Sequence, residues 1–585
     1  MVLRQILILG VVLDSLLDNQ ITVRNEARVL IQGQLSDSSD HLSTVHSIAN
    51  TPIKFDVLCK FLENYSNKTV ASELYLGFLE GFRLNYTGPR MTTDCRIIVS
   101  VFGNEVEVAK KLLKEINLGR IAGPFNNIPL FNLRLSPIGL CPKKDGSWRL
   151  IQHLSYPHGL SVNDYIDKGL CSVTYTPFDH ALDMVGSQGK FALIGKKDIS
   201  SAFRLLPVNP DDFELLGFKF LDFYFVDRCL PQGCSLSCAT FEKFSTFLEC
   251  IFKDKTGSES VIHYLDDFLF AGPGTDSTCL NLMSEFDCLC DRLGVPLAHD
   301  KTVGPTHVLT FLGLEINTIE MSVKIPKEKL LKLKTIISNL LGKKRTTLRV
   351  LQSFTGILNF CSRVIPTGRA FNRRFYDAMS GISNPRHHIR LTASIKEDIR
   401  LWSLFLDCFN GKFYFPDSDW ISNVDMELFT DSAGSAFGGC ASYLHPNWAF
   451  FPWPSYWLGC DILKDITFLE LLPIVLAFHL WYAIFANKKI ILHVDNKALV
   501  HILNSKTSRS RRVMHILRPL VLKAMVYNIQ FKAMHITSNK NCIADAISRQ
   551  QWPRFRRMSP EALQEPEKVP QSFLQVISNL NPTSC

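Results

Sequence analysis

The stretch VIHYLDDFLFAG, residues 261–272, places two adjacent aspartates, Asp266 and Asp267, between two short apolar runs. Such runs, rich in β-branched and aromatic side chains, are typical of strands. The few residues between them leave room only for a tight turn, so we predict a hairpin with both carboxylates at its tip. Aspartates are also common in turns without any catalytic role. The pair therefore indicates a functional site only together with other residues.

A third carboxylate lies upstream, at the end of another apolar run. Asp198 closes FALIGKKD (191–198) and is followed by ISSAFRLLPV, which predicts a strand end before a helical turn. Three carboxylates from two adjacent strands can bind a pair of divalent cations, which stabilise the attacking and leaving oxygens of an in-line phosphoryl displacement. Residues 190–320 alternate strand-like and helix-like segments, which predicts a mixed α/β core.

A second set of acids follows in the last third of the chain. Asp431 ends the strand-like MELFTD, Glu470 lies in the helix-like FLELLPIVLAF, Asp495 ends KKIILHVD, and Asp545 lies in NCIADAISR, where a helix begins. Four carboxylates from separate elements of one α/β unit suit two-metal phosphodiester hydrolysis.

Composition narrows the class of protein. At 585 residues and 46% apolar content the chain has room for three to five domains, and global disorder is excluded. The 17 cysteines contain no CxxC pair, which argues against a zinc ribbon and a disulfide framework and favours a reducing compartment. The apolar run Phe468 to Phe485 contains Glu470, Pro473 and His479, so we interpret it as a core helix rather than a membrane span. Asp14 interrupts the apolar opening, and we expect an intracellular protein in the cytoplasm or nucleus, not a secreted one.

The net charge of +9 is concentrated in one segment. Residues 324–400 contain 17 basic and four acidic residues, a net charge of +13, which is typical of a surface that contacts a phosphate backbone. A solvated helical face is the alternative. Within it we single out Lys343, Lys344 and Arg345 as nucleic-acid-binding residues. A second basic run, KTSRSRRVMHILR (506–518), adds the candidates Arg509, Arg511 and Arg512.

The motifs of residues 196–316 carry a family resemblance. KKDISSAF, LPQGCSLSCATFEKF, YLDD, HDKT and FLGLEI resemble the palm motifs of reverse transcriptases in order and spacing. Upstream, SPIGLCPKKDGSWRLIQHLSYPHGLSVNDYI is similar to their fingers region. The resemblance implies a metal-binding triad, two residues that grip the incoming triphosphate, an aromatic steric gate against ribonucleotides, and a residue near the nascent base pair. In this sequence they are Asp198, Asp266 and Asp267; Lys143 and Arg149; Phe203; and Gln232.

The later acids, in the order D…E…D…D, resemble the ribonuclease H domains of retroelement polymerases. The resemblance implies that Asp431, Glu470, Asp495 and Asp545 are catalytic and metal-binding, and that His535 matches a mobile histidine near that site. Each of the two sites is then expected to use two Mg²⁺ or Mn²⁺ ions. Asp431-Ser432-Ala433-Gly434 is also similar to an aspartic-protease element, but the remaining ribonuclease acids follow it.

Among retroelements, the similarity is strongest to DIRS-like retrotransposons, with Gypsy-class elements and hepadnaviral polymerases as alternatives. The DIRS resemblance implies a tyrosine recombinase from the same element as a partner. RNA template, DNA primer, RNA–DNA hybrid and dNTPs are the other expected partners, and no membrane is expected. A catalytically silent, captured nucleic-acid-binding protein is an alternative, but all seven acids are present. A Gag-like assembly protein would need a zinc knuckle or a long basic tail, and neither is seen.

The expected fold class is α/β (α+β): a right-hand polymerase of fingers, palm and thumb, followed by a ribonuclease H-like domain. The expected boundaries are a mostly helical region of unknown role at 1–103, fingers and palm at 104–320, a basic, mostly helical thumb and connection at 321–422, ribonuclease H at 423–549, and a Pro-containing flexible tail at 550–585.

Overall fold

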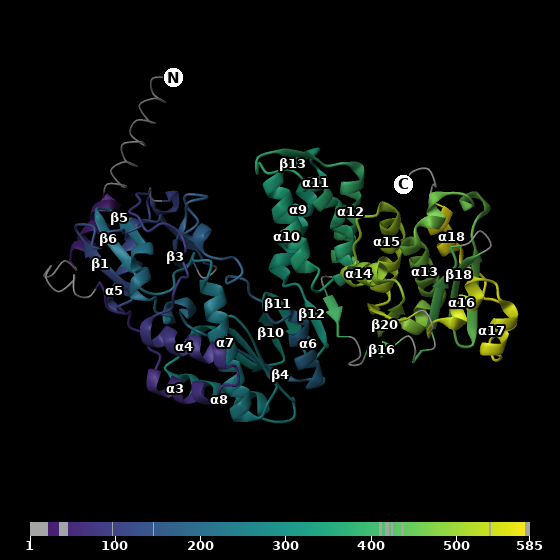
Figure 1. The fold of residues 1–585 in the computed structure, drawn as a ribbon, viewed down its shortest axis with the longest axis horizontal. Coiled ribbons are helices and arrows are strands. Elements are labelled where there is room, and N and C mark those ends of the chain that lie inside the picture. Colours follow the sequence, from purple (N-terminus) through teal and green to yellow (C-terminus); the bar gives the residue numbers. More distant parts are fainter. Residues whose placement is uncertain are drawn as a thin grey trace, which may run out of the picture. The chain divides into compact units, whose positions relative to one another are not determined.

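The computed structural model describes residues 22–33, 45–95, 98–143, 146–408, 412–415, 420–422, 425–426, 428–434, 438–537 and 540–578. The apolar opening of the chain lies outside these ranges. The chain divides into two compact units, and each is described by itself. The N-terminal unit comprises Met1–Met184 and Leu193–Thr306, and the C-terminal unit comprises Val185–Ala192 and His307–Cys585. Figure 1 labels their elements.

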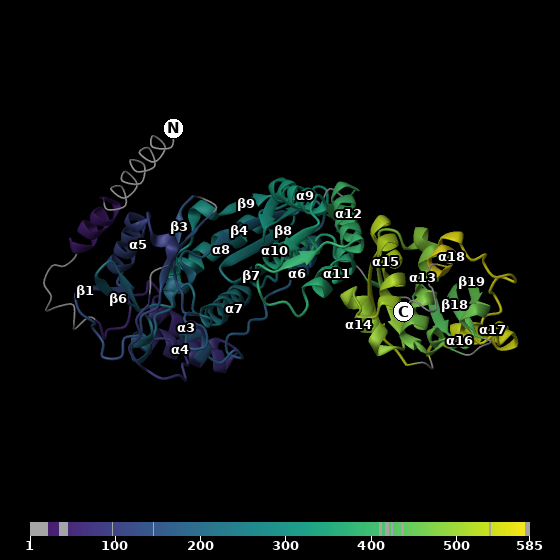
Figure 2. The same cartoon turned by 90° about the horizontal axis from the view of Figure 1, so that it is seen from above.

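A four-stranded antiparallel sheet, ordered β7-β8-β4-β9, is the centre of the N-terminal unit. Its strands are β4 (Leu193–Asp198), β7 (Val261–Tyr264), β8 (Asp267–Gly272) and β9 (Val303–Thr306). Tyr264 pairs with Asp267 across the β7–β8 turn, so the expected hairpin is confirmed. The helices α7 (Ser237–Thr256) and α8 (Thr278–Leu293) lie beside this sheet (Figure 2). They pack on it through Phe252, Phe270 and Phe286, whose rings touch one another.

Smaller elements surround this sheet in the region expected to form the fingers. One sheet has the order β1-β6-β5, and a separate hairpin joins β2 to β3. A second apolar cluster, which includes Val108, Leu112 and Phe225, packs α5 against β1 and β6. The elements are α5 (Glu105–Asn117), β1 (Ile121–Phe125), β2 (Ile138–Pro142), β3 (Trp148–Gln152), α6 (Phe178–Ser187), β5 (Gly217–Phe220) and β6 (Phe223–Asp227).

The region before residue 104 is built into the same core. Helices α3 (Phe55–Asn64) and α4 (Lys68–Glu80) supply Leu58, Leu62 and Phe78 to the apolar cluster that also contains Phe244 of α7. The Phe78 and Phe244 ring centroids are 5.4 Å apart. The boundary that the sequence suggested at 103/104 is therefore not a structural division, because these amphipathic helices bury their apolar faces against the palm helices.

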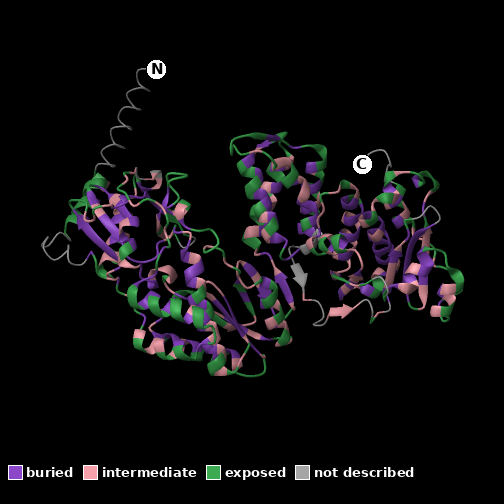
Figure 3. Ribbon diagram, viewed as in Figure 1, coloured by how far each residue is buried: buried purple, intermediate pink, exposed green. Residues whose placement is uncertain are grey.

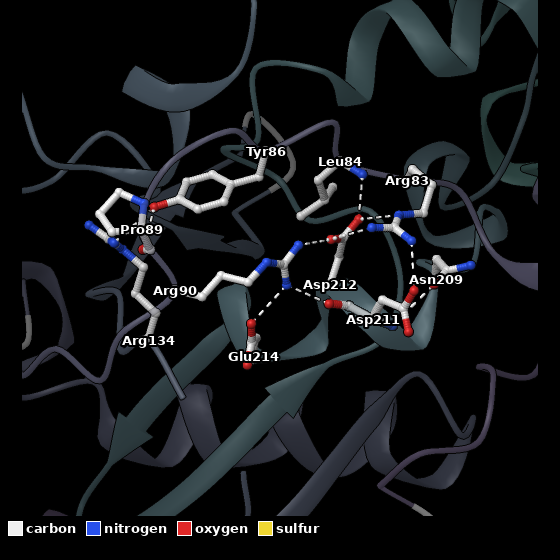
Figure 4. Close-up of polar contacts among 10 residues, drawn as sticks. All are labelled: Arg83, Leu84, Tyr86, Pro89, Arg90, Arg134, Asn209, Asp211, Asp212 and Glu214. Atoms are coloured by element: carbon white, nitrogen blue, oxygen red, sulfur yellow. Dashed lines mark hydrogen bonds and ion pairs between the residues drawn. The ribbon is translucent and has the colours of Figure 1, made fainter. Parts of the chain in front are cut away.

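A buried carboxylate fixes the strand-like segment after α4 to the same unit. Asp212 accepts hydrogen bonds from the Leu84 backbone N–H (2.8 Å), Arg83 Nε (3.1 Å) and Arg90 Nη2 (2.6 Å), as Figure 4 shows. Arg90 also pairs with Glu214 at 2.8 Å. A buried charge requires such partners, because desolvation is costly unless hydrogen bonds and opposite charge compensate it. The network joins segments more than 120 residues apart in sequence.

The C-terminal unit begins with a sheet and a group of helices. The sheet has the order β10-β11-β12-β15, and a two-stranded ribbon pairs β13 with β14. Helices α9, α10, α11 and α12 carry most of the basic segment. The bounds are β10 (Val308–Phe311), β11 (Leu314–Asn317), β12 (Ser322–Lys324), α9 (Lys327–Leu341), β13 (Arg345–Thr347), α10 (Leu348–Cys361), α11 (Arg373–Met379), β14 (His388–Arg390), α12 (Ala393–Cys408) and β15 (Lys412–Tyr414).

A second α/β region occupies the rest of this unit. Parallel strands form the sheet β16-β20-β21, and antiparallel strands form β17-β18-β19. The elements are β16 (Trp420–Ser422), β17 (Leu428–Ser432), β18 (Gly439–Leu444), β19 (Asn447–Pro452), α13 (Ile466–Phe485), β20 (Lys489–Val494), α14 (Lys497–Ser505), α15 (Arg511–Val526), β21 (Gln530–His535) and α16 (Cys542–Ser548). Helix α13 is long and apolar enough to cross a membrane, but 72% of its apolar window is buried in this unit (Figure 3), as expected of a core helix.

One expectation for the end of the chain was wrong. The segment after residue 549 forms α17 (Trp552–Met558) and α18 (Gln571–Ser578) rather than a flexible tail. Phe555 and Phe573 are fully buried and pack on Trp448 and Phe451, so long-range aromatic contacts order short helices that prolines separate. The two compact units divide at 306/307. The expected domain boundaries at 320/321 and 422/423 stay predictions.

Candidate functional sites

The first site lies at the end of the β4–β8 pair. Asp198 stands directly opposite Asp267 in the antiparallel register, and Asp266 occupies the adjoining turn, where Leu265 adopts a left-handed φ of 54°. The Asp266 carbonyl accepts a hydrogen bond from the Ile199 N–H at 2.9 Å, which ties the turn to the chain just after Asp198. The structure thus brings together the three acids predicted from sequence.

Two lysines face these acids. Lys301 Nζ lies 2.7 Å from Asp198 Oδ1, and Lys196 Nζ lies 3.4 Å from Asp267 Oδ1. Burial and the neighbouring Asp198 carboxylate raise the pKa of Asp266 to about 6. Burial also raises the pKa of Asp267, against the opposing effect of Lys196. Sequence reasoning included Lys301 only as part of the HDKT motif and gave it no role; its pairing with Asp198 depends on a contact across 103 residues.

The donor set suits a hard divalent cation, since carboxylate oxygens are the ligands that Mg²⁺ prefers. The raised pKa of Asp266 has a repulsive component from Asp198, which a bound cation would relieve. Within the described ranges, however, no group of three or more His, Cys, Asp or Glu side chains is already arranged to hold a metal ion. Because an ammonium group already pairs with Asp198, cation binding here has to include rearrangement of Lys301.

Phe203 and Gln232 lie on segments that follow the core strands. Phe203 is in a short 3-10 turn (Ala202–Leu205), half-buried, with its ring 5.8 Å from that of Phe241. The following Arg204 is paired with Asp227 at 2.7 Å and with Glu115 at 2.9 Å, so this turn is anchored on its other side. The Gln232 carbonyl accepts a hydrogen bond from the Gln152 N–H at 2.9 Å.

The two residues expected to grip a triphosphate share the β2–β3 hairpin. Arg149 lies in β3 opposite Cys141. Lys143 lies in the turn, where its backbone N–H donates a 2.7 Å hydrogen bond to the Ser147 carbonyl. Both side chains are exposed. Lys144 and Asp145 of the same motif lie outside the described residues. The hairpin therefore presents two cations to solvent, available to an anionic ligand.

The second site gathers four acids within the C-terminal unit. Asp431 is the last residue but one of β17, Glu470 lies in the second turn of α13, Asp495 follows β20, and Asp545 lies in α16. Burial, with repulsion from Asp545 and Asp495, raises the pKa of Asp431 to about 6 despite a hydrogen bond from Ser548. Burial, Asp431 and Asp495 raise the pKa of Glu470. These mutual effects show that the four acids predicted from widely separated motifs share one electrostatic site.

Several partners of these acids were not predicted. Ser548 Oγ donates to Asp431 Oδ2 at 2.5 Å, and Asn541 Nδ2 donates to the Thr430 carbonyl at 2.8 Å. Asp545 pairs with Arg549 at 2.6 Å and Arg554 at 2.8 Å. Burial opposes the charged form of Asp545, but the two arginines lower its pKa. Ser548 and Asn541 lie in the NCIADAISR motif that already carried the resemblance, so its polar residues were the available signal.

His535, the weakest candidate, ends β21 and is exposed. Its Nε2 lies 3.2 Å from the Asp495 carbonyl oxygen. The histidine therefore stands at the edge of the four-acid site, as the resemblance implied.

The basic candidates divide into exposed and structural residues. Lys343, Lys344 and Arg345 are exposed, but they lie in a turn and at the start of β13 rather than in a helix, because residues 345–347 pair with 388–390. Arg509 and Arg511 are exposed as expected.

The other basic residues of 506–518 are structural, which corrects the expectation for Arg512. Its largely buried side chain lies 3.6 Å from Asp465. Lys506 is buried and donates to the Leu503 and Phe531 carbonyls at 2.6 and 2.8 Å. Arg518 pairs with the fully buried Asp398 of α12 at 2.8 Å. These three cations stabilise the fold instead of facing a ligand.

Comparison with known proteins places the first site within a segment that matches a family model. Residues 141–316 match the model for "Reverse transcriptase (RNA-dependent DNA polymerase)". The matched segment contains Asp198, Asp266 and Asp267 together with Lys301.

Individual relatives are viral proteins. The chain is 30% identical to Protein P of duck hepatitis B virus over 172 residues, which are 28% of this chain and 20% of the relative. It is 25% identical to the Gag-Pro-Pol polyprotein of Mason-Pfizer monkey virus over 268 residues, 44% of this chain and 14% of the relative. The chain thus spans a fifth or less of the length of these relatives. Among solved structures, a foamy viral protease-reverse transcriptase bound to double-stranded DNA covers 82% of this chain and 81% of its own at 16% identity and a TM-score of 0.46.

Proposed function

We propose that the protein is an RNA-directed DNA polymerase of a retroelement. The observation that carries this proposal is the register pair Asp198 and Asp267, with Asp266 in the adjoining turn, inside the segment that matches the reverse transcriptase model. In the proposed reaction the primer 3′-hydroxyl oxygen attacks the α-phosphorus of a dNTP, and pyrophosphate leaves. When bound, two divalent cations would neutralise charge on the attacking and leaving oxygens.

The chain's own residues have distinct parts in this proposal. Asp198, Asp266 and Asp267 would hold the cations. Lys143 and Arg149, exposed on one hairpin, would bind the triphosphate, since cations there do not compete for the metals' ligands. Phe203 would exclude the 2′-hydroxyl of a ribonucleotide by contact, and its position is fixed by Phe241 on one side and the Arg204 ion pairs on the other.

We further propose ribonuclease H activity at the second site. Its support is the convergence of Asp431, Glu470, Asp495 and Asp545 from four separate elements, where burial and, after it, repulsion between the acids raise the pKa values of Asp431 and Glu470. These acids would hold two Mg²⁺ or Mn²⁺ ions and position the water that cleaves the RNA strand. The acids are intact, which favours an enzyme over a silent nucleic-acid-binding protein.

The expected partners are RNA template, DNA primer, RNA–DNA hybrid and dNTPs. We infer a DIRS-like element from the sequence motifs, and with it a tyrosine recombinase as a partner. We also infer an intracellular location in the cytoplasm or nucleus; the described cysteines are free thiols, as in a reducing compartment.

A primer-extension assay tests the proposal. Full-length protein is given a DNA primer on an RNA template of defined sequence, all four dNTPs and Mg²⁺, with EDTA as the control. Extension that depends on both the RNA template and the cation is expected. A folded protein that extends no primer with either Mg²⁺ or Mn²⁺ would contradict the polymerase assignment.

A further inference from the structure

The β13–β14 ribbon presents one strongly cationic face. Side chains alternate along its strands: Thr346 and Ile389 are buried, whereas Arg345, His388 and Arg390 are exposed. The turns that lead into the two strands add exposed Lys343 and Lys344 on one side and Arg386 and His387 on the other, and Arg349 follows at the start of α10. The ribbon and these flanking residues, 343–349 and 386–390, are called the basic ribbon below.

The cross-strand register places like charges together. Arg345 is the direct partner of Arg390, and like charges directly opposite each other destabilise a strand pair. Among the described residues, none of the basic-ribbon cations has a carboxylate within salt-bridge distance. Two exposed arginines therefore lie on directly paired residues, without a carboxylate partner among the described residues.

The remainder of the same basic segment behaves differently. Arg374 pairs with Asp398 at 3.0 Å, Arg373 with Asp377 at 2.7 Å and Lys334 with Asp407 at 2.6 Å. Lys396 donates to the Leu341 carbonyl at 2.8 Å. Several cations of this segment are thus paired within the fold, whereas those of the basic ribbon have no carboxylate partner among the described residues.

We propose that the basic ribbon binds the phosphodiester backbone of a nucleic-acid duplex, with Arg345 and Arg390 contacting phosphates together. The inference rests on the proposed polymerase function, for which it names a holding surface outside both catalytic sites. Phosphates would remove the repulsion between the two guanidiniums, and arginine matches phosphate oxygens bidentately. The outer face of the ribbon consists of Arg345, Thr347, His388 and Arg390. Because the proposed contacts are to phosphates, they carry no sequence information.

Salt-dependent binding measures this contact. Each phosphate neutralised contributes a slope of roughly 0.7–0.9 to the fall of log K with log salt. The double variant Arg345→Ala/Arg390→Ala should therefore lose about 1.4–1.8 units of slope. Between 50 and 200 mM salt, the affinity of the wild type for an RNA–DNA hybrid should then fall about 7- to 12-fold more than that of the variant. Two hybrids of unrelated sequence should give the same difference.

A matched control removes the same charge elsewhere in the segment. Lys327 and Lys332 are exposed on α9, and Lys327→Ala/Lys332→Ala should keep a slope closer to that of the wild type than to that of the ribbon variant. Equal slopes for the ribbon variant and the wild type, or equal losses in both double variants, would overturn the inference. Retained hybrid binding with lost binding to vesicles that contain phosphatidylserine would also overturn it and assign the ribbon to a membrane surface.

The Tm of an arginine variant is a second readout, because it distinguishes an arginine that binds phosphate from one that stabilises the fold. Because Arg345 and Arg390 repel each other in the free protein, Arg390→Gln should weaken hybrid binding while leaving Tm equal to or above that of the wild type. A lower Tm together with unchanged binding would show that the arginine is structural. If the wild type extends primers but fails these tests, only the ribbon inference fails; if it extends no primer, the proposed function fails first.

Discussion

Replacing Asp212 with Asn tests whether the segment after α4 is an integral part of the polymerase unit. The Asp212 side chain is 1% exposed; it forms ion pairs with Arg83 and Arg90 and accepts a hydrogen bond from the Leu84 backbone N–H. Breaking a buried ion pair by neutralising one partner costs about 3–5 kcal/mol. Arg83 and Arg90 retain 49% and 30% exposure and can turn to water, so we expect the lower end, about 3 kcal/mol.

Thermal unfolding of the full-length protein is the assay. At about 2.1 cal/mol/K of unfolding entropy per residue, 1 kcal/mol corresponds to slightly under about 2 °C for a unit larger than 250 residues, so the first unfolding transition of Asp212→Asn should fall by about 5 °C. Asp211→Asn is the matched control, because Asp211 pairs with the same Arg83 but its side chain is 72% exposed. An exposed pair is worth about 0–1 kcal/mol. Similar Tm values for the two variants would refute the reasoning that burial, not ion-pair number, sets the stability of this network.

Two further predictions concern residues near the first site. Phe203→Val should lower the preference for dNTPs over rNTPs in kcat/KM by orders of magnitude, since the smaller side chain admits the 2′-hydroxyl; an unchanged ratio in single-nucleotide incorporation would make Phe203 a core aromatic only. Burial disfavours the His263 imidazolium, but Glu242 and Glu249 raise the pKa of His263 to about 9. Because this pKa lies above the unfolded value of 6.5, the stabilisation is complete below pH 6.5 and is lost as the pH rises through 9. The free energy of unfolding, measured in urea, should therefore be about 3 kcal/mol lower at pH 9.5 than at pH 6. His263→Gln should abolish this difference.

Local patterns predicted the first site well. The β7–β8 hairpin and the strand end at Asp198 follow from apolar runs that two acids interrupt, and antiparallel pairing then places the three acids together. The pairing of Lys301 with Asp198 could not be predicted, because it depends on how the chain returns to the sheet after α8.

Long-range contacts explain the incorrect predictions. The chain after residue 549 has prolines and little periodicity, yet Phe555 and Phe573 find aromatic partners more than 100 residues upstream. Residues 343–347 lie in a basic segment that was expected to be mostly helical, but β-branched Thr346 and Thr347 pair with a strand about 40 residues later. Arg512 looks like a ligand-binding cation in a basic run, and only the fold brings Asp465 to it.

The most direct test measures DNA synthesis and RNA cleavage together in single-acid variants. Asp266→Asn and Glu470→Gln each change one acid in a different compact unit. On an RNA template with labelled primer and labelled hybrid RNA, Asp266→Asn should abolish extension and leave cleavage, and Glu470→Gln should abolish cleavage and leave extension. Loss of both activities in either variant, with Tm equal to that of the wild type, would contradict the assignment of two separate catalytic sites.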